Sequence, residues 1–214
     1  MADKIIYLLR HGQTEYNVKG IAQGGGVDTS LNETGRQQAF AFYQTYRHLS
    51  FDVCITSKLK RTHETVAPFI EAGIPWEQSP HINEMGWGTH EGKVSTEQSR
   101  LEFQQVIDAW ERGEYHAAMA QGESAAALGE RLSLFVDHIR QRQESLLLVC
   151  SHGRAMRGLM CLLNDKPLSA MSLYSHANTG VWVIEQRGQS FRVLTANDTS
   201  HLLLHEEGSW HSLR

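Results

Sequence analysis

Two histidines stand one residue after short apolar runs, and each is followed by a glycine. His11 follows the run 4–9 and His152 follows the run 146–150. A neutral imidazole can attack phosphorus, and the planar guanidinium of an arginine such as Arg10 matches phosphate oxygens. These residue types suit phosphoryl transfer, which needs a nucleophile, positive charge around the phosphoryl oxygens and a proton for the leaving oxygen.

Five short blocks of sequence occur in an order that characterises one family. The blocks are residues 10–17, Ser57-x-Leu59-x-Arg61-x-x-x-Thr65, 84–92, 122–124 and 151–153. Taken singly, a histidine at a strand end, an arginine on a helix or a glutamate in a loop is usually a solvated or hydrogen-bonded residue. Taken together and in order, the blocks resemble the histidine phosphatase superfamily, also called the phosphoglycerate mutase-like family, over residues 10 to about 179.

The resemblance implies a role for each matching residue. His11 matches the nucleophile that becomes phosphohistidine, His152 a second histidine that donates to the phosphoryl group, and Glu84 the proton donor. Arginines supply the positive charge that a metal would otherwise provide, so neither a metal nor a cofactor is expected. The expected substrate-binding residues are Arg10, Asn17, Gln23, Gly24, Arg61 and Gly153.

Neighbouring residues refine these expectations. Gly12 and Gly153 are expected to let the backbone approach the substrate closely, because glycine has no side chain. Glu91 lies in the same block as Glu84 and is the other candidate for the proton donor. Ile21 stands where many members of the family carry an arginine, so one anion contact is missing and a multiply phosphorylated substrate is not favoured.

Three functions remain to be weighed. The favoured one is a metal-independent phosphatase that hydrolyses a small phosphorylated metabolite through a phosphohistidine intermediate. The first alternative is a cofactor-dependent phosphoglycerate mutase, which must bind a bisphosphate through additional cationic side chains. The segment 93–121 is short and more acidic than basic, which disfavours such binding. The second is an inactive binding module, which predicts loss of His11, Arg61 or His152, and all three are present.

The elements that must position these residues alternate between strands and helices. Apolar runs predict buried strands at 4–9, 51–56 and 146–150, and a late hairpin at 181–185 and 191–195. Helices are predicted from Asn32 or Thr34 to about His48, from near Ser57 or Leu59 with a kink or break at Pro68, over 123–142 and over 154–163. The alternation predicts an α/β fold, and with the resemblance a three-layer α/β/α sandwich with a mostly parallel sheet. Ligands then sit beyond the carboxyl ends of the strands.

Length favours one domain over residues 1–214. The resemblance implies that it is a histidine phosphatase domain, with 93–121 as a lid or specificity insertion. The formal charge of −4 argues against nucleic-acid binding, and no apolar run approaches the ~20 residues of a membrane span. Cys54, Cys150 and Cys161 lack metal-ligand spacing and indicate buried thiols in the cytoplasm. His201 and His205 have a helical metal-ligand spacing without a third ligand, so no metal site is predicted. The oligomeric state is left open.

Overall fold

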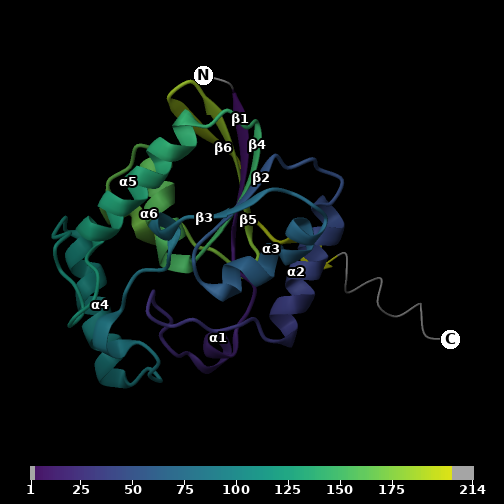
Figure 1. The fold of residues 1–214 in the computed structure, drawn as a ribbon. Helices are drawn as coiled ribbons and strands as arrows, with labels where there is room; N and C mark the ends of the chain where they lie inside the picture. The colour runs from purple at the N-terminus through teal and green to yellow at the C-terminus, as the bar shows by residue number, and fades with distance from the viewer. Residues whose placement is uncertain (1–2, 204–214) are drawn as a thin grey trace.

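A six-stranded sheet forms the centre of the computed structural model, which describes residues 3–203 (Figure 1). Its strands are β1 (Lys4–Arg10), β2 (Val53–Thr56), β3 (Trp76–Gln78), β4 (Leu146–Ser151), β5 (Val181–Arg187) and β6 (Ser190–Asp198). The strand order is β3-β2-β4-β1-β5-β6. The first four strands in this order are parallel, whereas β5 is antiparallel to β1 and to β6. The prediction of a mostly parallel sheet is confirmed.

Helices cover both faces of the sheet. The helices α2 (Glu33–Tyr46) and α3 (Lys60–Glu71) lie on one face, and α5 (Ala125–Gln141) and α6 (Gly153–Leu163) lie on the other (Figure 1). Successive side chains of a strand point to opposite faces. Val53 and Ile55 therefore join the core under α5 and α6, while Cys54 joins the core under α2 and α3. The predicted three-layer sandwich is confirmed.

The predicted helices are present with small shifts at their ends. Asn32 caps α2, because its side chain accepts a hydrogen bond of 2.8 Å from the Gly35 N–H. Ser124 caps α5 in the same way. Pro68 lies in the last turn of α3, and the helix continues past it. The predicted division of this helix at Pro68 is therefore wrong. The proline lacks an N–H, but so near the end of the helix this removes only one helical hydrogen bond.

The sequence patterns did not predict β3, α1 (Glu15–Lys19) or α4 (Glu97–Glu111). The strand β3 has three residues and α1 has five, which is too short for a periodic pattern. In α4, Phe103, Val106, Ile107 and Trp110 follow the i, i+3, i+4, i+7 spacing and pack against the core, so this helix had a periodic signal that the sequence analysis missed. Three short 3₁₀ segments complete the structure of the described residues, at Pro80–Ile82, Gly88–His90 and Leu168–Leu173.

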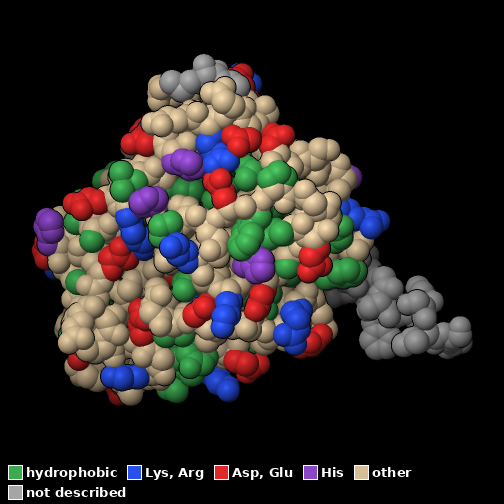
Figure 2. Space-filling view, in the orientation of Figure 1, with side chains coloured by type: hydrophobic (Ala, Val, Ile, Leu, Met, Phe, Trp, Pro, Cys, Tyr) green, Lys and Arg blue, Asp and Glu red, His purple; other side chains and the backbone are tan. Residues whose placement is uncertain are grey.

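The surface and the cysteines agree with the composition. Acidic and basic side chains are interspersed on the face that Figure 2 shows, without one large patch of either sign. Cys54, Cys150 and Cys161 are free and buried, as predicted. Burial raises the pKa of the Cys54 thiol to about 12 and that of Cys161 to about 11. Within residues 3–203, no helix combines the length and the apolar character needed to cross a membrane.

Candidate active site

The candidate site lies where three neighbouring parallel strands end. Arg10 at the end of β1 pairs in register with Ser151 at the end of β4, and Thr56 at the end of β2 pairs with Cys150. The residues that follow these strands therefore meet at one edge of the sheet. His11 and His152 are both buried there, with their ring centroids 5.2 Å apart.

The hydrogen bond of the His11 ring fixes which nitrogen is free. Its Nδ1 lies 2.7 Å from the carbonyl oxygen of Gly12. A carbonyl can only accept, so Nδ1 carries the hydrogen and the neutral ring keeps its lone pair on Nε2. Burial, followed by the positive charges of Arg61 and Arg10, lowers the pKa of His11 well below its usual value. The neutral ring is thus the form present at neutral pH.

Arg61 and Ser57 hold the second histidine. The Nε of Arg61 donates to Nδ1 of His152 at 3.1 Å, because arginine can only donate. The hydrogen of the neutral His152 ring is therefore on Nε2, which donates to Ser57 Oγ at 2.8 Å. Burial and the Arg61 charge lower the pKa of His152 well below its usual value. In this arrangement both ring nitrogens of His152 are already occupied.

The two arginines differ in how far their donors are used. Arg61 is fully buried, and its Nη1 also donates to the Val27 carbonyl at 2.7 Å. Arg10 donates from Nη1 to the His176 carbonyl at 3.0 Å, but its buried Nε has no partner among the described residues. Burial lowers the pKa of each guanidinium, and the Glu84 carboxylate opposes that effect in both. Arg10 therefore keeps an unused donor at the site.

Glu84 is held at the N-terminus of α6. Its Oε1 accepts from the backbone N–H of Met85 and Ala155 at 2.8 and 3.0 Å, and its Oε2 accepts from the Arg154 N–H at 3.1 Å. A methyl group added at Gly153 would lie 3.6 Å from Arg10 Nε and 3.8 Å from Glu84 Oε2. Glu84 thus lies beside Arg10 at the same edge of the sheet.

Glu91, the other candidate for the proton donor, serves a different purpose. Its two oxygens accept from the backbone N–H groups of Gly26 and Trp87, at 2.9 and 2.8 Å. These bonds tie the glycine-rich loop to the segment after Glu84. A methyl group at Gly24 would lie 1.8 Å from Glu91 Oε1, so this approach requires a glycine at position 24.

The remaining predicted ligands are engaged within their own loops. Asn17 forms a capping box with Thr14, the N-cap residue of α1, whose N–H and hydroxyl donate to Asn17 Oδ1 at 3.0 and 3.1 Å. Gln23 bridges Thr14 and Thr29, with side-chain hydrogen bonds of 2.7 and 2.6 Å. The loop therefore uses one of the two Gln23 Nε2 hydrogens and orients the side chain.

Gly12 has a different reason to be glycine from the one expected. A methyl group added there would lie 2.7 Å from the carbonyl oxygen of Gly35 on α2. Packing of the loop against α2 therefore excludes a side chain at position 12. The Gly12 N–H donates to Thr65 Oγ1 at 2.9 Å, which fixes the loop against α3.

Several residues at the site were missed by sequence reasoning. Asn178 donates from Nδ2 to the His11 carbonyl at 2.9 Å, and His176 accepts from Arg10 through its own carbonyl. Both lie in the loop before β5, far from the matched blocks in the sequence. Arg154 and Arg157 lie in the first two turns of α6, after His152 and Gly153, and their three-residue spacing was the signal that could have found them.

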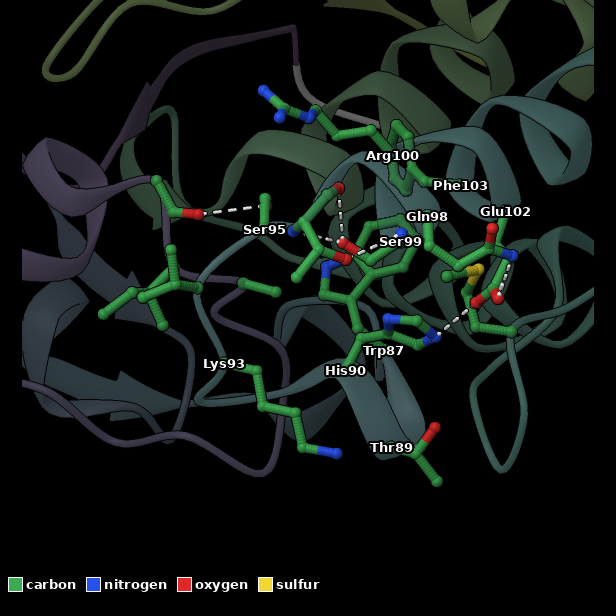
Figure 3. A pocket seen from close by; sticks show the side chains of 16 residues that line it. Trp87, Thr89, His90, Lys93, Ser95, Gln98, Ser99, Arg100, Glu102 and Phe103 are labelled. Carbon is green, nitrogen blue, oxygen red and sulfur yellow. Dashed lines mark hydrogen bonds and ion pairs between the residues drawn. The ribbon is translucent and has the colours of Figure 1, made fainter.

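A cavity of about 590 Å³ is lined by Trp87, which packs on Arg154, and its lining contains none of the predicted site residues. Figure 3 shows Trp87 at its centre, with His90 directed toward Glu102 across a contact of 3.1 Å. Its wall comes mainly from the loop after α1, the segment 89–96 and the first half of α4. A cavity of this volume falls within the range typical of sites for small molecules.

Potential metal ligands do not gather in the part of the chain that the structure describes. Within residues 3–203, no three side chains of His, Cys, Asp or Glu are arranged to hold an ion. His201 is buried and its Nε2 lies 3.1 Å from Thr179 Oγ1. His205, the other histidine of that spacing, lies outside the described residues.

Comparisons with known proteins point to one family. The family described as the histidine phosphatase superfamily (branch 1) matches residues 6–199. A Schizosaccharomyces pombe protein, named as a probable phosphatase, is 32% identical over 95% of this chain and 97% of its own. A 2,3-bisphosphoglycerate-dependent phosphoglycerate mutase from Bartonella henselae is 29% identical over 75% of this chain and 82% of its own. The structure of Bacillus stearothermophilus YhfR is 30% identical, with a TM-score of 0.80, and the match covers 93% and 99% of the two chains.

Proposed function

The chain belongs to the histidine phosphatase superfamily, and on this premise we propose that it is a metal-independent phosphatase acting on a small phosphomonoester. The observation that carries the proposal is the His11 ring, a buried neutral imidazole whose Nδ1 is bonded to the Gly12 carbonyl. Such a ring has one nucleophilic atom, Nε2, and it lies beside two guanidinium groups. This combination supports a phosphohistidine intermediate.

The proposed reaction has two steps. In the first, Nε2 of His11 attacks phosphorus, the bond to the ester oxygen breaks, and Glu84 gives that oxygen its proton. In the second, the Glu84 carboxylate takes a proton from water, which attacks the phosphohistidine and releases phosphate and the neutral imidazole. Arg10 and Arg61 would bind the phosphoryl oxygens in both steps, since guanidinium groups stabilise the spread negative charge.

The second histidine would join the phosphate site by exchanging its partners. When Arg61 turns its Nε–H to a phosphate oxygen, Nδ1 of His152 loses its donor. The Ser57 hydroxyl can then donate to Nε2, which leaves Nδ1–H to bind the phosphoryl group. Ser57 would act as the positioning residue that permits this change of tautomer.

The neutral ligands of the phosphate would use the atoms that their loops leave free. Asn17 would donate from Nδ2, because its Oδ1 is held by Thr14. Gly24 and Gly153 would contribute backbone N–H groups or a close approach. Gln23 would donate the second hydrogen of Nε2, because Thr14 accepts the first and Thr29 binds Oε1.

We further propose that residues 1–214 form one domain in which 93–121 determines specificity. The start of this segment is fastened to the loop after α1. The Ala22 N–H donates to the Lys93 carbonyl at 3.3 Å, and Ile21 forms a bridge with Val94. The first half of α4 then forms a wall of the cavity, where it could contact the organic part of a substrate. The three buried free cysteines support a cytoplasmic location.

The first test is hydrolysis of 4-nitrophenyl phosphate in the presence of a chelator. We expect full activity, because arginines supply the positive charge. Activity that disappears with the chelator and returns with a divalent ion would overturn the metal-independent mechanism. The same preparation with 3-phosphoglycerate and a trace of 2,3-bisphosphoglycerate should release inorganic phosphate, whereas a mutase would yield 2-phosphoglycerate.

A further inference from the structure

We propose that Arg154 and Arg157 form an anion subsite next to the phosphate site, and that the substrate is a phosphomonoester whose organic part carries a carboxylate. The inference rests on the proposed phosphatase function, and it adds the class of substrate. Both residues lie at the start of α6, three positions apart and so on one face of the helix.

The guanidinium of Arg154 is enclosed by aromatic rings and has no acceptor among the described residues. It lies 5.8 Å from the ring centroid of Trp87, 5.5 Å from that of Phe103 and 5.8 Å from that of Trp110. Rings that pack against a guanidinium leave the N–H groups at its edge free, and that edge matches a carboxylate in two parallel hydrogen bonds. The surroundings of Arg154 therefore leave its hydrogen-bonding edge available to a ligand.

The arginines near the site have few carboxylate neighbours. Arg10, Arg61, Arg154 and Arg157 all interact with the charge of one carboxylate, Glu84. No described carboxylate lies within 4.0 Å of any of the four guanidinium groups. Asp28 and Glu91 also act on Arg61, whereas Glu84 is the one described carboxylate that acts on Arg154 and Arg157, so a carboxylate on the substrate would find its positive partners at these two residues.

A second group of unpaired polar atoms points to the same place. His176 is only 8% exposed, and both of its ring nitrogens lack a partner among the described residues. Arg10 Nε is unpaired in the same way, and Arg157 makes only a long contact of 3.5 Å to the Met171 carbonyl. Buried polar atoms without partners cost free energy unless a ligand or water satisfies them.

Arg154 also connects the proposed proton donor with a wall of the cavity. The Arg154 backbone N–H binds Glu84, the proposed proton donor, at 3.1 Å. The side chain of the same residue packs on Trp87 and Phe103, which line the cavity of about 590 Å³ (Figure 3). A substrate with its phosphate at His11 and its organic part toward the cavity would therefore pass the Arg154 guanidinium.

Two matched pairs of substrates test the subsite. In the first pair, 3-phosphoglycerate differs from glycerol 3-phosphate by a carboxylate in place of a hydroxymethyl group. In the second, O-phosphoserine differs from phosphoethanolamine by its carboxylate. We expect the wild-type protein to prefer the carboxylated member of at least one pair in kcat/KM. We expect Arg154→Met to reduce that preference by about 10- to 100-fold, the usual effect of losing hydrogen bonds between charged groups.

Methionine at position 154 keeps an apolar contact with the three rings, so the variant separates charge from packing. Arg157→Met is the second variant in case the first does not fold. Arg154→Lys should keep part of the preference, and Arg47→Gln, which removes an exposed charge at the end of α2, should keep all of it.

The outcomes are separable. A wild-type protein that hydrolyses all four esters without preferring a carboxylate overturns the subsite and leaves the phosphatase function standing. An equal loss on both members of a pair in Arg154→Met also overturns it, because it assigns the residue to packing alone. Failure to hydrolyse these esters and 4-nitrophenyl phosphate overturns the phosphatase function and the subsite together.

Discussion

At the scale of single residues, the two neighbouring glutamates are distinguished by their partners. Glu84 accepts three backbone hydrogen bonds at the start of α6 and lies beside Arg10. Glu91 accepts from Gly26 and Trp87 and so joins two loops. We therefore assign the proton transfer to Glu84, although both carboxylates fall within the same block of sequence.

The leaving group reveals which carboxylate transfers the proton. An alkyl phosphate releases a strongly basic alkoxide, whereas 4-nitrophenolate leaves with little help. General acid catalysis contributes about 10²–10⁴-fold, so Glu84→Gln should lose about that much in kcat/KM on an alkyl ester. On 4-nitrophenyl phosphate the loss should be much smaller. The measured quantity is the ratio of the two losses, because kcat/KM excludes the later dephosphorylation step.

Glu91→Gln is the matched control, and it should affect both esters alike through the loops that Glu91 joins. Equal losses in Glu84→Gln on the two esters would mean that Glu84 positions the substrate and transfers no proton. A loss in Glu91→Gln that depends on the leaving group would assign the proton to Glu91.

At the scale of elements, the sequence predicted most of the strands and helices that are marked by apolar runs, by a periodic apolar stripe or by a helix-capping residue. The buried strands, α5 with its Ser124 cap and α6 follow from apolar runs and from a 3.6-residue stripe. The strand β3 could not be predicted in this way, since it has three residues and lies at the edge of the described sheet, paired with β2. Periodicity contains no information about such long-range pairing.

The same limit applies to the candidate site. The residues at strand ends, His11 and His152, could be placed because parallel strands end at one edge of the sheet. The aromatic surroundings of Arg154 come from separate segments and become visible only when α4 packs near α6. The charges of 93–121 taken alone disfavour the binding of a bisphosphate, but Arg154 and Arg157 lie outside that segment and were overlooked.

The junction of the first loop with α2 offers a prediction about stability. A methyl group at Gly12 would lie 2.7 Å from the Gly35 carbonyl, whereas one at Gly153 would meet Arg10 at an ordinary 3.6 Å. Overpacking typically costs about 1–3 kcal/mol, so Gly12→Ala should lower the free energy of unfolding by that amount. Gly153→Ala should change it by much less. Chemical denaturation measures both, and similar losses would refute the packing role of Gly12.

At the scale of the whole molecule, the net charge is −4, yet Arg10, Arg61, Arg154 and Arg157 lie together around the candidate site. Three histidines, His11, His152 and His176, are buried near these arginines, and burial lowers the pKa of each. Neighbouring arginines lower these pKa values further. An anionic substrate can therefore be attracted locally, because the field in a site depends on nearby charges.

These histidines should make the fold sensitive to acid. Burial, then Arg157 and Arg10, lower the pKa of His176 to about 3 in the folded state, against about 6.5 in the unfolded chain. Between these values only the unfolded chain binds the proton, so the free energy of unfolding falls as the pH decreases. From pH 7 to pH 5 the share of His176 is about 2 kcal/mol.

His176→Gln should remove that share of the loss, measured by urea denaturation at the two pH values. His48→Gln, at an exposed position after α2, is the control and should keep the full loss. An unchanged loss in His176→Gln would show that the buried neutral histidine is not the source of the acid sensitivity.

The most direct test of the account is to find the atom that carries the phosphoryl group. Wild-type protein mixed briefly with a ³²P-labelled phosphomonoester and quenched in alkali should retain one acid-labile label, and peptide mapping should locate it on His11. His11→Ala should retain no label and should not turn over. A label on a serine or cysteine, or wild-type turnover by His11→Ala, would contradict the phosphohistidine mechanism.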